Sequence, residues 1–184
     1  MTPIAESIAE RLRALEIALP DVAPPVVAGY TPSFVPWVRS ENLLFLSGRL
    51  AKRDGQILAG KLGEAISVPE GKAAARGVAI ELLAAVKEAV GDLDRVERIV
   101  RLFVMVNCTP DFTEPHVVAN GASELFLQLF GERGAHARSA IGVAQAPFGA
   151  DQRLDRQTAT VGQGQFGRLC DGFVQSTKPY VQPG

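Results

Sequence analysis

Few residues of this chain could hold a metal ion or form a disulfide. Its 184 residues include two cysteines, Cys108 and Cys170, and two histidines, His116 and His136. The cysteines lie far apart and lack the spacing of a zinc site, and the histidines do not complete a ligand set with them. We therefore expect neither a disulfide nor a metal site, and we expect Cys108 to be a buried or half-buried thiol at a strand end.

The chain also lacks an excess of charge and a long apolar run. It has 19 basic and 20 acidic residues, a net charge of −1, and its basic residues form no cluster of the kind that binds nucleic acid. No stretch approaches the roughly 18 apolar residues of a membrane span. Acids and arginines interrupt the apolar pattern of the N-terminus, which therefore does not resemble a secretory signal. We expect a cytoplasmic protein that binds neither nucleic acid nor membrane.

The apolar residues, 47% of the chain, are enough for one well-buried core. Within residues 3–16 they recur at helical spacing, which predicts a short amphipathic helix ahead of the main domain. The prolines of residues 20–25 cannot continue a helix and predict an extended connector. Residues 34–40 and 42–47 are apolar runs rich in β-forming residues and predict a pair of strands.

The longest expected helix begins after Ser67 and runs to Val90. Ser67 is a favourable N-cap, and Glu70 follows three residues later, at the spacing of a capping box. Apolar residues then recur on one face of the helix. Gly91 follows the last of them, as a helix-ending glycine commonly does.

The second half of the chain is expected to alternate strand and helix. Residues 98–107 have one wholly apolar face and one mixed face, which predicts a strand whose apolar face lies under helices. Residues 115–130 predict a second helix, and residues 136–144 a further strand. This order predicts an α+β fold with two helices on one face of a single sheet. The mixed face is too apolar for water alone, so we expect closed homo-oligomerisation to cover it.

Three motifs stand in the order and spacing of the Rid (reactive intermediate deaminase) family, also called YjgF-type or endoribonuclease L-PSP. They are 42–48 (NLLFLSG), 120–126 (NGASELF) and 137–139 (ARS). The chain resembles this family over residues 24–150, with a helix and connector in residues 1–23, and looks closest to a branch with a short N-terminal helix. The resemblance implies a chorismate-mutase-like fold, a trimer whose sheets form a central barrel, and clefts between subunits.

The resemblance also implies an activity, the hydrolysis of reactive enamine or imine intermediates to 2-keto acids and ammonia without a cofactor. Arg138 matches the arginine that holds the substrate carboxylate, for which a guanidinium is suited because it donates two parallel hydrogen bonds. By the same resemblance Ser47, Gly48 and Asn120 lie in or beside the cleft. Each residue also has a structural explanation. Arg138 could form an ion pair at a subunit interface, the Ser47 hydroxyl could stabilise a turn, and Asn120 could be a polar residue on a solvent-exposed face of a helix.

Three positions depart from the family pattern. Ala140 stands where many deaminating members have a cysteine, and Phe34 stands where they tend to have a tyrosine; both positions belong to the implied substrate site. The glutamate that helps position the attacking water is absent, since no glutamate follows Glu132. Asp151 or Asp155 is the candidate for the missing acid.

Residues 151–184 form a divergent tail, rich in Gln and Gly and without clear periodicity beyond a short patch at 158–161. A frameshift would produce such a change, and genuine divergence is the alternative; re-sequencing codons 145–155 distinguishes them. The tail is expected to be disordered unless residues 154–161 replace the family's last strand.

Three functions follow from these observations. The first is a Rid-type imine deaminase. The second is a non-catalytic binder or sensor of small carboxylates that keeps Arg138 without the groups that handle water. The third, an endoribonuclease, has little physical support, because the chain has no basic stripe and no aromatic stacking platform.

Overall fold

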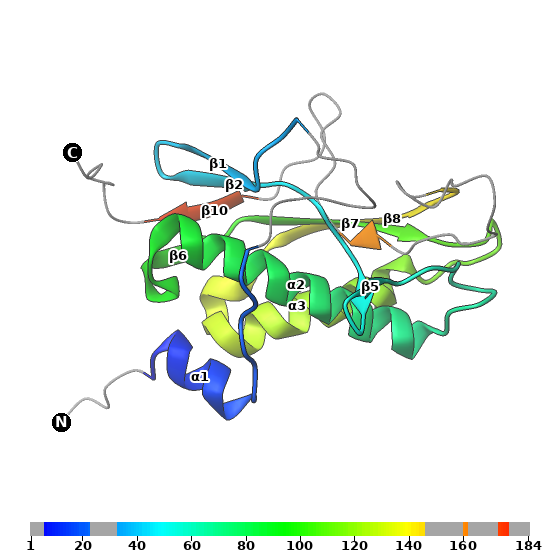
Figure 1. The fold of residues 1–184 in the computed structure, drawn as a ribbon, viewed down its shortest axis with the longest axis horizontal. Helices are drawn as coiled ribbons and strands as arrows, with labels where there is room; N and C mark the ends of the chain where they lie inside the picture. The colour runs from blue at the N-terminus through cyan, green and yellow to red at the C-terminus, as the bar shows by residue number, and fades with distance from the viewer. Residues whose placement is uncertain (1–5, 23–32, 146–159, 162–172, 177–184) are drawn as a thin grey trace.

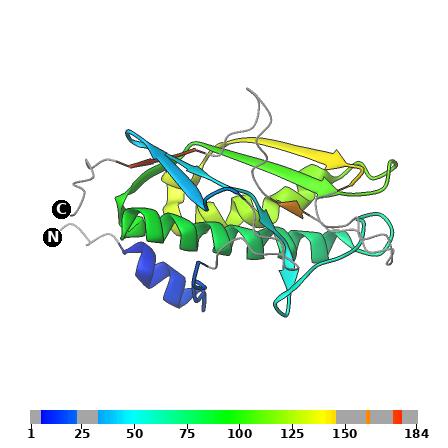
Figure 2. The same cartoon turned by 45° about the horizontal axis from the view of Figure 1, so that its top comes forward.

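The computed structural model of the chain describes residues 6–22, 33–145, 160–161 and 173–176. Two long helices lie side by side beneath a layer of strands (Figures 1 and 2). The helices are α1 Ile8–Ala14, α2 Val68–Val90 and α3 Pro115–Phe130, with 3-10 turns η1 Leu93–Arg95 and η2 Gly131–Gly134. The strands are β1 Trp37–Ser40, β2 Leu43–Leu46, β3 Arg49–Leu50, β4 Lys52–Arg53, β5 Gln56–Ile57, β6 Val96–Ile99, β7 Arg101–Asn107, β8 Ala137–Val143, β9 Thr160–Val161 and β10 Phe173–Ser176. None of the described helices is long and apolar enough to cross a membrane.

The ends of α2 are those that the sequence predicts. The Glu70 carboxylate accepts a hydrogen bond from the backbone N–H of Ser67 at 2.9 Å, and the Ser67 hydroxyl accepts one from the Glu70 N–H, which completes the capping box. At the other end Gly91 has a φ of 80°, a conformation that costs a residue with a Cβ more than it costs glycine. The helix therefore begins and ends for local reasons.

The N-terminal helix was expected over 3–16, of which residues 3–5 lie outside the described residues; within the rest it is shorter than expected. It begins at Ile8 because Ser7 forms a second capping box, in which the Glu10 carboxylate accepts from the Ser7 N–H at 2.8 Å. Arg11 Nη1 donates to the carbonyl oxygen of Leu129 at 2.8 Å, which attaches α1 to the end of α3. The helix is thus an addition docked on the helical layer.

The first two strands form the expected hairpin. β1 and β2 pair antiparallel with Trp37 opposite Leu46, so the first strand starts later than residue 34. β2 then pairs with β10, and β10 with β6, which gives the order β1-β2-β10-β6. A strand at 173–176 was not expected from the sequence, and it lies between two strands from the first hundred residues.

The strand expected over 98–107 is interrupted at Val100. Before it, β6 pairs with β10; after it, β7 pairs in parallel with β8. The carbonyl oxygen of Val100 accepts a hydrogen bond from the Ala137 N–H at 3.0 Å, at the point where the chain changes pairing partner. The expected single sheet is therefore divided. The described strands pair in four hydrogen-bonded groups, β1-β2-β10-β6, β7-β8, β3-β9 and β4-β5, and the first two separate where β6 ends.

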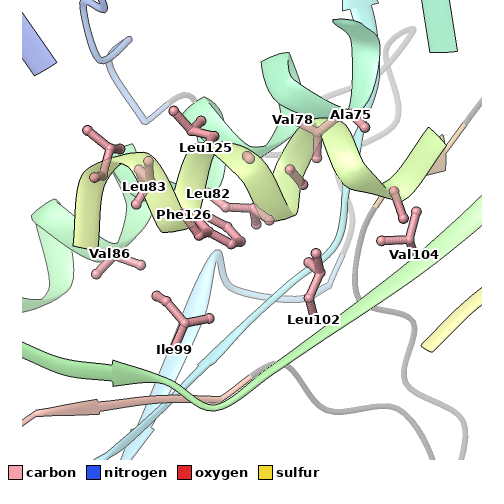
Figure 3. Packing of buried hydrophobic residues seen from close by; sticks show 14 of the residues in the cluster. Ala75, Val78, Leu82, Leu83, Val86, Ile99, Leu102, Val104, Leu125 and Phe126 are labelled. Carbon is pink, nitrogen blue, oxygen red and sulfur yellow. The ribbon is translucent and has the colours of Figure 1, made fainter. Parts of the chain in front are cut away.

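The core lies between this layer and the long helices (Figure 3). The helices α2 and α3 and the strands β6 and β7 contribute buried side chains to this core. They include Ala75, Val78, Leu82, Leu83, Val86, Ile99, Leu102, Val104, Leu125 and Phe126. The even-numbered face of β7 is buried under the helices as predicted. Gly121 allows the two helices to approach closely, since a Cβ there would overlap the carbonyl oxygen of Lys72.

The opposite face of the strands carries exposed apolar side chains. Val38 is 55% exposed and Ile141 is 44% exposed. Alternation along β1 and β8 places both away from the helices, because their strand neighbours Arg39 and Ala140 share the face of Leu44 and Val104. One face of the layer is thus covered by helices and the other bears exposed apolar residues.

Candidate functional site

Arg138 lies on β8 and its side chain reaches α3. In the parallel pair it stands opposite Leu102, a buried residue of the helix-facing side of β7. Its Nη1 donates one hydrogen bond to Asn120 Oδ1 at 2.8 Å and another to Ser123 Oγ at 3.0 Å. The structure therefore brings together Arg138 and Asn120, which the sequence proposed, and adds Ser123.

The α-helix explains why one nitrogen finds two acceptors. Residues three apart lie on the same helix face, so Asn120 and Ser123 present their side chains to the same region. Both side chains are half-buried, as is Arg138. The guanidinium is consequently held by an amide oxygen and a hydroxyl oxygen, without a neutralising carboxylate among the described residues.

The Nε–Nη2 edge of the Arg138 guanidinium has no hydrogen-bond acceptor among the described residues. These two nitrogens carry parallel N–H groups that match the two oxygens of a carboxylate. The site therefore consists of a half-buried cation with one edge anchored and one edge available to an anion.

His136 extends the group beyond Arg138. Its Nδ1 lies 2.6 Å from the carbonyl oxygen of Gly134, and its Nε2 lies 3.0 Å from Ser123 Oγ. A carbonyl oxygen only accepts, so Nδ1 carries the proton and, in the neutral ring, Nε2 accepts from the Ser123 hydroxyl. Burial, opposed by the bond to Gly134 and assisted by the charge of Arg138, lowers the pKa of His136 and favours this neutral ring.

The other proposed site residues lie elsewhere in the chain. Ser47 Oγ donates to the carbonyl oxygen of Val35 at 2.6 Å, and the Ser47 N–H donates to Pro36 at 2.9 Å. Gly48 follows directly and is half-buried, whereas Phe34 is 51% exposed. No hydrogen bond among the described residues joins this loop to Arg138, so the chain presents two separate groups of proposed site residues.

Ala140 shares the face of Arg138. Two residues separate them on β8, and Ala140 packs partly against the hydrophobic core. Its methyl group can neither donate nor accept a hydrogen bond. Any polar chemistry beside Arg138 must therefore come from other side chains.

The sequence also predicted a buried or half-buried Cys108 and no metal site, and these predictions concern residues outside the group around Arg138. Cys108 is a buried free thiol directly after β7, as expected, and burial raises its pKa. Over the described ranges, no three His, Cys, Asp or Glu side chains are arranged to hold a metal ion. Cys170 and the two candidate acids, Asp151 and Asp155, lie outside the described residues.

Ser123 and His136 were not predicted as site residues. Ser123 stands within the motif at 120–126, three residues after Asn120, and His136 stands two residues before Arg138. Helical spacing and strand alternation were the available signals. Neither signal alone shows that the two side chains meet.

Comparisons with known proteins give a consistent result. A family model described as "YjgF/chorismate_mutase-like, putative endoribonuclease" matches residues 9–150. Protein TCP17 of Trypanosoma cruzi is 47% identical over 150 residues, which cover 80% of this chain and 91% of that protein. The match to the family model thus ends where the divergent tail begins.

Two solved structures are similar over most of their length. Atu1372 of Agrobacterium tumefaciens, a protein of unknown function, is 33% identical with a TM-score of 0.71, over 92% of each chain. A "putative endoribonuclease" of Shewanella oneidensis is 27% identical with a TM-score of 0.73, over 92% of this chain and 99% of that one. The resemblance seen in the sequence motifs is confirmed, and the chain belongs to the YjgF/chorismate-mutase-like family.

Proposed function

We propose that this protein hydrolyses reactive 2-imino acids, or their enamine forms, to 2-keto acids and ammonia. The observation that carries the proposal is the state of Arg138. Its Nη1 is anchored to Asn120 and Ser123, while Nε and Nη2 have no partner among the described residues. An anchored guanidinium with one available edge suits a small carboxylate better than it suits a structural ion pair.

Hydrolysis of an imine requires mainly that the substrate be held in a fixed orientation toward a water molecule. Two charge-assisted hydrogen bonds to the carboxylate would fix the substrate carbon next to it, which is the imine carbon. Water adds to that carbon, the C=N bond becomes a single bond, and ammonia leaves as the carbonyl forms. Fixing the reacting atoms in this way can supply several kcal/mol of the barrier reduction, on the order of 7–11 in the best cases. Arg138 is thus the residue on which substrate binding and catalysis both depend.

The remaining substrate contacts are proposed to come from Ser47, Gly48, Phe34, Asn120 and Ala140. Ser47 and Gly48 belong to a different part of the chain from Arg138. A cleft between subunits of a homotrimer would bring such separate groups together. The exposed apolar face of the strands supports an assembly of this kind, because water alone covers such a face poorly.

A non-catalytic carboxylate binder is the second candidate. It is favoured by the surroundings of Arg138, where the described residues supply no hydrogen-bonded carboxylate and where Ala140 offers no polar group. Such a protein would bind the keto acid and leave the imine unchanged. An endoribonuclease activity, which the family description mentions, has less support in this chain, since the net charge is −1 and no basic stripe is present in the sequence.

The deciding experiment measures keto-acid release from freshly generated 2-iminobutanoate. We expect a rate above buffer background that is lost in Arg138→Ala. Arg98→Ala is the matched control, because Arg98 is an exposed arginine of the same strand layer whose side chain makes no hydrogen bond to a described residue. A rate of keto-acid release no higher than the buffer background for the unmodified protein would refute the proposed deaminase activity. Binding of 2-oxobutanoate that depends on Arg138 would then establish the carboxylate binder.

A further inference from the structure

A chain of hydrogen bonds leads from the proposed ligand site to the backbone of η2. It runs from Arg138 Nη1 to Ser123 Oγ at 3.0 Å, from Ser123 Oγ to His136 Nε2 at 3.0 Å, and from His136 Nδ1 to the Gly134 carbonyl oxygen at 2.6 Å. The last acceptor is a backbone carbonyl, so Nδ1 donates to it, and in the neutral ring Nε2 therefore accepts from Ser123. We infer that Ser123 and His136 are positioning residues that orient the Arg138 guanidinium and hold its Nε–Nη2 edge toward the ligand.

The direction of the chain determines what Ser123 can do. A hydroxyl has one proton and two lone pairs. Since Nδ1 of His136 donates to Gly134, Nε2 of the neutral ring accepts a hydrogen bond from the Ser123 hydroxyl. The lone pairs of Oγ are then left to accept from Arg138. Without the histidine the hydroxyl proton has no fixed acceptor, so the Ser123 side chain is free to change rotamer and holds the guanidinium less firmly.

The ring of His136 is itself held in place. The edge of the imidazole meets the Phe126 ring at an interplanar angle of 82° and a centroid separation of 5.7 Å. Gly134 lies against α3 so closely that a Cβ there would overlap the carbonyl oxygen of Phe126. Both contacts tie the start of β8 to the same helix that carries Ser123, so the distance between Ser123 and His136 is set by backbone packing.

Asn120 provides a second, independent anchor. It accepts from the same Nη1 at 2.8 Å and stands about one turn before Ser123 on the same face of α3. Two acceptors on one nitrogen restrict rotation about the Cζ–Nε bond. An ordered guanidinium loses less conformational entropy when it binds a carboxylate. The identity of the ligand in this inference rests on the proposed function. The ordering of Arg138 by Ser123 and His136 does not depend on it.

The first test needs no ligand. Rotation of the Arg138 guanidinium, measured as exchange between its Nη1 and Nη2 NMR signals, should be slow in the unmodified protein. Ser123→Ala should raise the exchange rate about tenfold, because it removes a hydrogen bond to a charged group. His136→Phe keeps an aromatic ring against Phe126 and removes both nitrogens, and it should also raise the rate. Ser123→Thr keeps the hydroxyl and should restore the slow exchange.

The second test is binding of 2-oxobutanoate by the same variants. Affinity should fall about tenfold in Ser123→Ala and in His136→Phe, and should stay within about twofold in Ser123→Thr and in the Arg98→Ala control. Unchanged exchange rates in folded Ser123→Ala and His136→Phe would overturn the inference whatever the protein binds. Loss of slow exchange together with no binding in any variant would refute the proposed ligand and leave the positioning role established.

Discussion

At the scale of single residues, His136 links the site to the stability of the fold. The folded chain lowers the pKa of His136 from its ordinary 6.5, chiefly by burial, so the folded state disfavours the protonated ring. Below that ordinary value the unfolded chain binds a proton that the folded chain resists. The free energy of unfolding should therefore fall as pH falls from 6.5 toward the pKa of the folded state. The full contribution of His136 to stability should be present above pH 6.5.

Urea unfolding between pH 5 and pH 7.5 measures this dependence, with the range set by the titration of histidine at about 6.5. The variant His136→Phe lacks the titrating ring and should show a flatter dependence over the same window. An equal slope in both proteins would mean that His136 does not contribute in this way. His116, which is exposed, remains in both proteins and so cancels from the comparison.

Arg138 shows why a residue type alone does not define a site. Arg133 Nη1 also has two neutral acceptors, both of them backbone carbonyl oxygens. Arg138 differs in that its two acceptors are side chains of α3, those of Asn120 and Ser123. Asn120 and Ser123 accept from one of the three guanidinium nitrogens without neutralising the charge. The charge therefore remains available to an anion, which is the property that the proposed function requires.

At the scale of elements, the capping box of α2 gives a direct prediction. Ser67→Ala should lower the free energy of unfolding by about 1 kcal/mol, because the Glu70 N–H loses its acceptor. Hydrogen bonds from Ser67, assisted by Arg53, hold the pKa of Glu70 at about 2, below its ordinary 4.5. The substitution should raise that pKa toward the ordinary value, which a carboxyl carbon NMR titration of Glu70 would record. Ser67→Thr retains the hydroxyl and should change both quantities little.

The contact between α2 and α3 gives a second prediction. Gly121→Ala places a methyl group on the Lys72 carbonyl oxygen, which is backbone and cannot move without shifting a helix. We expect a loss of about 1–3 kcal/mol in the free energy of unfolding, the range for overpacking. Gly77→Ala is the matched control, since its added methyl meets nothing within 4 Å. The control should stabilise α2 by roughly 0.5–1 kcal/mol, and equal effects of the two substitutions would refute the argument.

At the scale of the whole molecule, the exposed apolar face predicts self-association. We expect light scattering to report a trimer for the unmodified protein and a smaller species for Ile141→Lys, because a charge on that face would be buried without a partner. Leu127→Lys is the control, since Leu127 is similarly exposed, at 47%, but lies on α3. A monomeric unmodified protein, or equal effects of the two substitutions, would contradict this use of the face.

Several features followed from the sequence because they depend on neighbours along the chain. The limits of α2 are local, since Ser67 and Gly91 satisfy the helix ends themselves. The buried face of β7 follows from alternation, and Arg138 was found from its motif on β8. Family membership followed in the same way, from motifs that lie in continuous segments of the chain.

Other features were decided only by tertiary structure. The break at Val100 arises because β6 and β7 pair with different strands, one of which, β10, comes from a segment without a recognisable pattern. Ser123 and His136 meet because Gly134 packs against the backbone of α3. Sequence patterns record which face a residue occupies, whereas contacts between elements depend on how closely two backbones approach. The sequence alone therefore predicted Arg138 as a site residue, and the packing of β8 on α3 determined which side chains hold it.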